Sequence, residues 1–100
     1  MEIRELQDII KEYVSQMDEK YKCTHDSEAT FNHIIEEIGE LAREINKPKI
    51  RNQQIIKQEI SNEIADVFIL LIHLCSVHDI DVEECILYKM QELKQRNNLE

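Results

Sequence analysis

Apolar residues recur at every third or fourth position along most of this chain, which is the spacing of one face of an α-helix. The pattern predicts four helices, over residues of about 2–21, 28–46, 54–77 and 81–96. The residues that form the four apolar stripes are Ile3, Leu6, Ile10, Tyr13, Val14 and Met17; Phe31, Ile34, Ile38, Leu41, Ala42 and Ile45; Ile56, Ile60 and Ile64; and Val82, Ile86, Met90 and Leu93.

The segments between these stripes carry helix-ending and helix-starting signals. Asp26 and Ser27 are both good N-caps for the second helix, and Asp81 with Glu84 predicts a capping box for the fourth. The second helix should end before Pro48, because a residue that precedes proline avoids the helical region. Residues 49–53 are polar and predict a loop, and residues 78–80 predict a short turn.

The predicted fold class is all-α, with residues 1–100 forming a single domain. From Ala65 to Cys75 the third helix is apolar nearly all round, so we expect it to be the central and most buried element. Short connections favour antiparallel neighbours, which predicts an antiparallel four-helix bundle. Apolar residues in excess of what one small bundle can bury also predict a homo-oligomer.

Composition narrows the possible partners and compartments. A formal charge of −9, from 21 acidic and 12 basic residues, argues against a nucleic-acid-binding surface. Three cysteines without a CxxC pair favour a reducing, cytoplasmic location. The N-terminal residues are charged rather than signal-like, and the longest apolar run, 67–75, is short for a membrane span. We therefore expect neither nucleic acid nor membrane as a partner.

The candidate chemistry lies in two pairs of acids. Glu37 and Glu40 are three residues apart in the second helix, as are Glu63 and Asp66 in the third, so each pair shares a helix face. A carboxylate inside so apolar a run needs a partner, because burying it alone costs several kcal/mol. If the two helices pack antiparallel, the four acids can converge around a hard divalent cation, and Mg²⁺ suits such oxygen ligands. The simpler interpretation is a solvated acidic helix surface, which is common.

The string Glu36-Glu-Ile-Gly-Glu40, followed later by Glu63-Ile-Ala-Asp66, resembles the EExxE…ExxD signature of the MazG-like all-α nucleoside triphosphate pyrophosphohydrolases. The resemblance extends from about Thr24 to Arg96. It implies cleavage of the α–β phosphoanhydride of a nucleoside triphosphate to monophosphate and pyrophosphate. It also implies Mg²⁺, with Mn²⁺ as a substitute, and a homodimer or homotetramer.

The resemblance further implies a role for each matching position. Glu37, Glu40, Glu63 and Asp66 match the metal ligands. Glu36 matches a further catalytic position, where it could support the ligands, serve as an extra ligand or act as a base that orients water. Lys89, Arg96 and His25 match substrate-contacting residues, of which the first two approach the phosphates. Two departures put the base preference in doubt: Leu93 stands where many relatives carry asparagine, and the chain has no tryptophan.

Two other functions remain open from the sequence. One is a non-catalytic helical interaction module, and the other is a nucleotide-sensing module that binds without hydrolysis through a carboxylate metal site. His33 and His73 are expected to be ordinary helix-face or core histidines. No Glu-x-x-His pair exists, which disfavours a ferritin-like di-iron bundle.

Overall fold

The structure, a computed structural model, describes all residues from 1 to 100 and contains helices and connections without any strand. Its elements are α1 (Ile3–Tyr21), α2 (Ser27–Ile45), a short π-helical turn η1 (Lys47–Arg51), α3 (Lys57–Val77) and α4 (Val82–Arg96). The predicted all-α class is confirmed. The predicted helix boundaries also agree with the structure to within a few residues.

The helix ends follow from local side chains. The Asp26 carboxylate accepts a hydrogen bond of 2.9 Å from the Ala29 N–H at the start of α2. The Asp81 carboxylate does the same for the Glu84 N–H at the start of α4, also at 2.9 Å. Each bond satisfies one of the N–H groups that a helix start leaves without a partner. Both aspartates are therefore N-caps, as the sequence predicted.

The connection between α2 and α3 differs from the predicted loop. Its first part forms the turn η1, with Pro48 near the start, where a missing N–H costs nothing. The Lys47 ammonium lies 2.6 Å from a carboxylate oxygen of Glu44 and 2.6 Å from one of Glu59. This lysine therefore ties the end of α2 to the start of α3, and gives residues 47–51 a structure that their polarity alone did not predict.

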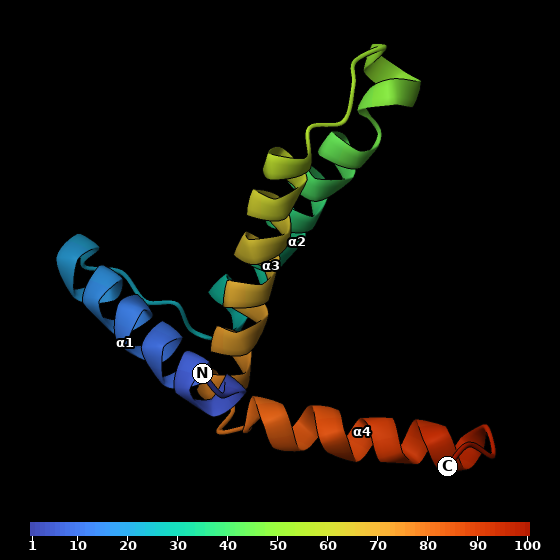
Figure 1. Cartoon of the computed structure of the whole chain (residues 1–100). Coiled ribbons are helices and arrows are strands. Elements are labelled where there is room, and N and C mark those ends of the chain that lie inside the picture. The colour runs from blue at the N-terminus through green and yellow to red at the C-terminus, as the bar shows by residue number, and fades with distance from the viewer.

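The helices form a hairpin with two arms (Figure 1). α2 and α3 pack side by side and antiparallel, α1 packs across the end of α3 remote from η1, and α4 turns away from the same end. A small apolar cluster holds this junction together, made of Ile10, Val14, Ile72 and Val82. The antiparallel hairpin is the part of the fold that places the candidate site.

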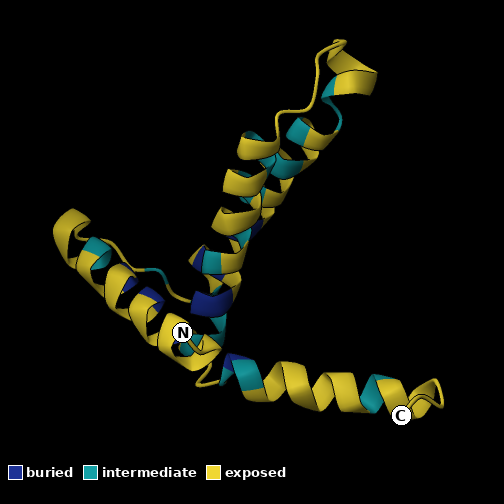
Figure 2. Cartoon of the chain, viewed as in Figure 1, coloured by how far each residue is buried: buried dark blue, intermediate teal, exposed yellow.

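The structure does not confirm a closed four-helix bundle within one chain. Only nine of 100 residues are buried, and most of the surface of every helix is exposed (Figure 2). The radius of gyration is 16.5 Å, against about 13 Å for a compact domain of this length. The reason is the direction of α4, which buries only Val82 and leaves one side of the hairpin uncovered.

The predicted central position of α3 holds for part of its length only. Leu70, Ile72 and His73, in its second half, are buried, whereas Phe68, one turn before Ile72, is 58% exposed. By length and composition alone α3 is apolar enough to cross a membrane, although a core helix of a soluble protein passes the same test. It packs against α2 and α1 and carries three acids in its first half, Glu59, Glu63 and Asp66, which is typical of a helix packed within a fold.

Candidate functional site

The α2–α3 hairpin brings three of the four predicted acids together. Oxygen atoms of Glu37, Glu63 and Asp66 all lie within 4.8 Å of one another. The glutamates are half-buried between the two helices, and Asp66 is exposed at the edge of the same cluster. The spacing of three residues along α3 places Glu63 and Asp66 on one face, and antiparallel packing turns that face towards Glu37. We call Glu37, Glu40, Glu63 and Asp66 the acid cluster.

Glu40, the fourth predicted acid, is exposed on α2 and close to Glu63. Burial raises the pKa of Glu63, and the negative charges of Glu40, Glu37 and Asp66 raise it further. Like charges held this close favour the protonated form of one of them. The raised pKa therefore indicates that the cluster lacks a compensating positive charge.

The acid cluster also lacks hydrogen-bond and ion-pair partners. One carboxylate oxygen of Glu37 and one of Glu63 are buried without any hydrogen-bond partner. No lysine or arginine forms an ion pair with any of the four acids. Buried oxygens normally have partners, and unpaired buried carboxylates are costly. The cluster therefore fits a hard divalent cation, whose preferred ligands are carboxylate oxygens.

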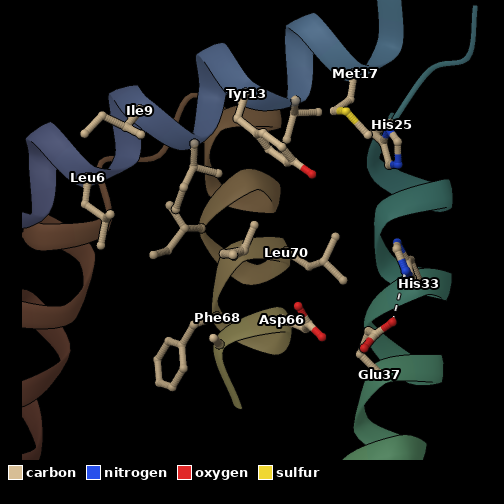
Figure 3. Close-up of a pocket in the computed structure, with 15 residues that line it drawn as sticks. Leu6, Ile9, Tyr13, Met17, His25, His33, Glu37, Asp66, Phe68 and Leu70 are labelled. Atoms are coloured by element: carbon tan, nitrogen blue, oxygen red, sulfur yellow. Dashed lines mark ion pairs between the residues drawn. The ribbon is translucent and has the colours of Figure 1, made fainter. Parts of the chain in front are cut away.

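His33 belongs to this site, although the sequence analysis set it aside. Its Nε2 atom lies 3.2 Å from the Oε1 atom of Glu37, one helical turn further along α2 (Figure 3). The side chain of Glu37 is only 15% exposed, so this contact fixes the direction of a half-buried carboxylate. A partner that orients a metal-binding carboxylate commonly affects metal affinity. The spacing of four residues is the sequence signal from which this pair could have been found.

An apolar cavity of about 650 Å³ opens on one side of the acid cluster, between α1 and the hairpin. Glu37 and Asp66 lie at its edge, with Asp66 directed towards Glu37 (Figure 3). Eleven of its 15 lining residues are hydrophobic. They include Leu6, Ile9 and Tyr13 from α1 and Phe68 and Leu70 from α3.

A second cavity, of about 430 Å³, has the opposite character and lies on the other side of the cluster. None of its seven lining residues is hydrophobic. The lining consists of Glu40, Arg43, Glu44, Lys47, Arg51, Gln53 and Glu63. Its three basic residues were not predicted from the sequence, because two of them, Lys47 and Arg51, lie in the segment where η1 forms.

A comparison with protein families identifies the family of this chain. The model of the MazG nucleotide pyrophosphohydrolase domain matches residues 25–99, which is three quarters of the chain. The chain belongs to the MazG family. No curated protein and no solved structure matches it. The match begins after α1, so this helix, which forms one wall of the apolar cavity, precedes the part that the family model covers.

The other predicted site residues of this MazG domain lie apart from the acid cluster. On α4, the Lys89 ammonium is 3.1 Å and the Arg96 guanidinium 3.0 Å from the same Glu92 carboxylate oxygen. Both lie on the arm that points away from the hairpin (Figure 1). Glu36 is exposed and lines neither cavity beside the cluster.

His25 does reach the apolar cavity, which it lines from the start of α2. Its ring contacts the Asp18 carboxylate, and its backbone N–H donates to the second oxygen of that carboxylate at 3.1 Å. Burial of Asp18 opposes ionisation, but these hydrogen bonds from His25 outweigh it and lower the pKa of Asp18. His25 is therefore held in place at the cavity wall. Whether it contacts substrate stays a prediction.

Proposed function

We propose that this MazG domain hydrolyses nucleoside triphosphates, ribo- or deoxyribonucleotides, at the α–β phosphoanhydride in a Mg²⁺-dependent reaction. The family assignment supports a nucleotide pyrophosphohydrolase, and thus a hydrolase. Two observations support the metal dependence: carboxylate oxygens of Glu37, Glu63 and Asp66 converge within 4.8 Å of one another, and Glu37 and Glu63 each have a buried oxygen without a hydrogen-bond partner. In a merely solvated acidic face these carboxylate oxygens would be exposed to water instead of buried.

Glu37, Glu40, Glu63 and Asp66 would hold the cation, with Mg²⁺ as the physiological ion and Mn²⁺ as a substitute. When bound, the ion supplies positive charge against the triphosphate and makes coordinated water more acidic. The chain's own residues do the positioning: His33 fixes Glu37, and the hairpin fixes the separation of the two acid pairs. Glu36, at the first position of the EExxE motif, is proposed to orient the attacking water.

We also propose that the functional unit is a homodimer or homotetramer. The chain exposes 8004 Å² of surface for a mass of 11.9 kDa, whereas a compact monomer of that mass exposes roughly 6,000 Å². An excess of about 2,000 Å² per chain is what a large, obligate interface buries. Exposed apolar side chains on α4, including Ile86, Leu87 and Met90, are the surface that a second copy would cover.

This assembly would give Lys89 and Arg96 a role. Within one chain α4 holds them away from the acid cluster, so they would approach the phosphates bound to a neighbouring copy. The three cysteines are free, which suits the reducing cytoplasm where nucleoside triphosphates are made and used.

The decisive experiment is a substrate panel. The purified protein is incubated with each common ribo- and deoxyribonucleoside triphosphate and Mg²⁺, and pyrophosphate and orthophosphate are assayed separately. Pyrophosphate release without orthophosphate supports the proposal, and EDTA should abolish it. Binding without release would favour a nucleotide sensor, and neither binding nor release would favour a helical interaction module.

A further inference from the structure

The two cavities share the acid cluster between them. Glu37 and Asp66 line the apolar cavity, whereas Glu40 and Glu63 line the polar one. The four acids thus form a boundary with an apolar space on one side and a charged space on the other. A nucleoside triphosphate has the same division, since its nucleoside is largely uncharged and its phosphates carry all of its negative charge.

The charges in the polar cavity are not equivalent. The Lys47 ammonium is occupied by two carboxylates, at 2.6 Å each, and its side chain is only 15% exposed. Arg43 and Arg51 are exposed, and neither forms an ion pair within the chain. Once a cation offsets Glu40 and Glu63, these two guanidinium groups are the uncompensated charges of the cavity. Guanidinium groups bind phosphate oxygens in pairs of charge-assisted hydrogen bonds.

We infer that the substrate lies across the acid cluster in one direction, with its nucleoside in the apolar cavity and its β- and γ-phosphates on Arg43 and Arg51. This inference rests on the proposed function. In the reaction, water adds its oxygen to the α-phosphorus and loses a proton to the medium. The bond from the α-phosphorus to the α–β bridging oxygen breaks, and its electron pair leaves with pyrophosphate. Arg43 and Arg51 bind that leaving group, while the monophosphate stays on the apolar side.

The size and lining of the apolar cavity support this direction. About 650 Å³ lies within the range of pockets that enclose molecules of nucleoside size. Its walls are apolar, and the polar residues His25, His33, Glu37 and Asp66 complete the lining. A triphosphate in this cavity would meet hydrophobic walls and acids without a single lysine or arginine. The reverse orientation is therefore electrostatically unfavourable.

The test measures binding of the two products separately by titration calorimetry with Mg²⁺ present. One product probe is inorganic pyrophosphate, and the other is each of the four common deoxynucleoside monophosphates in turn. Arg43→Gln and Arg51→Gln should each weaken pyrophosphate binding by roughly tenfold and leave monophosphate binding unchanged. Phe68→Ala, at the exposed wall of the apolar cavity, should weaken monophosphate binding and leave pyrophosphate binding unchanged.

Lys49→Gln is the matched control, since it removes one positive charge from η1 at a position that does not line the polar cavity. It should leave both affinities unchanged, and circular dichroism checks that every variant is folded. The inference is overturned if pyrophosphate does not bind the wild type, if Lys49→Gln weakens it as much as Arg51→Gln, or if the arginine variants weaken both products equally. Failure of the proposed function is a different result, namely absence of pyrophosphate release from every triphosphate by the wild type.

Discussion

The α2–α3 hairpin and α4 differ in how much of their apolar surface is buried within one chain. The hairpin pairs two amphipathic faces, buries Ile34 and Leu70, and assembles the acid cluster without help. α4 has an apolar stripe as well, yet only Val82 at its first position is buried. The acid cluster of this MazG domain is therefore formed by the hairpin alone, whereas α4 leaves its apolar stripe exposed within one chain.

Different forces hold the two regions. Apolar packing between facing helices fixes the hairpin, but a polar junction fixes the direction of α4. The Gln7 side-chain amide donates to the Ile80 carbonyl at 2.8 Å and accepts from the Val82 N–H at 3.0 Å. Asp79, just before this junction, has a left-handed backbone with φ of 54°. The arm is thus aimed by a few hydrogen bonds and held by little apolar area.

The largest effect is expected from removing one charge of the acid cluster. Asp66→Asn should reduce pyrophosphate release by a factor on the order of 10³ or more, because the cation loses a ligand. The helical content by circular dichroism should not change, since Asp66 is exposed and supports no packing. Glu36→Gln removes one charge from the neighbouring position of the motif, and its effect should be smaller because Glu36 lies outside the acid cluster. Unfolding of Asp66→Asn would instead show that the hairpin needs this acid structurally.

The next largest effect is expected on the assembly of the chain, from a change on α4 that leaves the acid cluster intact. Ile86→Glu places a charge on the exposed apolar stripe, where Ile86 is 48% exposed in one chain. Burying that charge in an interface is costly, so the dissociation constant of the oligomer should rise by roughly a hundredfold. Light scattering after size-exclusion chromatography measures the mass. Gln95→Glu adds the same charge on the opposite face of α4, where Gln95 is exposed, and should leave the mass unchanged. A wild-type monomer at high concentration would refute the proposed assembly.

The hairpin could be predicted from the sequence better than the direction of α4, because its geometry follows from local spacing. The acid cluster was predictable because a three-residue spacing fixes a helix face, and a short connection makes neighbouring helices antiparallel. Glu37, Glu63 and Asp66 therefore meet where periodicity places them. His33 was available from its four-residue spacing to Glu37, but an ion pair at that spacing is common on helix surfaces and did not single it out.

The direction of α4 and the basic wall of the polar cavity were not predictable in this way. Gln7 sits inside an amphipathic pattern, and nothing local shows that its amide meets backbone groups 73 and 75 residues further along. Similarly, the polar run after α2 resembles a loop. Only the ion pairs of Lys47 with Glu44 and Glu59 show how η1 turns Arg51 towards the site. Both features depend on contacts between segments distant in the sequence.

A smaller effect is expected within the hairpin, at the histidine that contacts Glu37. His33→Ala should weaken Mg²⁺ or Mn²⁺ binding by roughly tenfold, because Glu37 loses the group that orients it. Titration calorimetry with each metal alone measures this without substrate. His78→Ala is the control, since His78 pairs with Ser27 at 2.8 Å away from the cluster. Equal metal affinity in both variants would show that His33 is only a helix-face residue.

The smallest effect should come from the polar junction that aims α4, and it should depend on pH. The hydrogen bond from the Glu84 N–H, followed by the hydrogen bond and charge of Arg4, lowers the pKa of Asp81 below its ordinary value. A depressed folded-state pKa stabilises the fold above the ordinary carboxyl pKa, and this contribution is lost as pH falls through the folded-state pKa. Asp81→Asn keeps a residue that caps helices well but removes the charge. Urea unfolding should therefore show a constant deficit in the free energy of unfolding between about pH 5 and 8 that shrinks below about pH 4. A deficit that does not change with pH would mean that the cap geometry, rather than the negative charge that Asp81 presents to the Glu84 N–H and to Arg4, holds α4 at this junction.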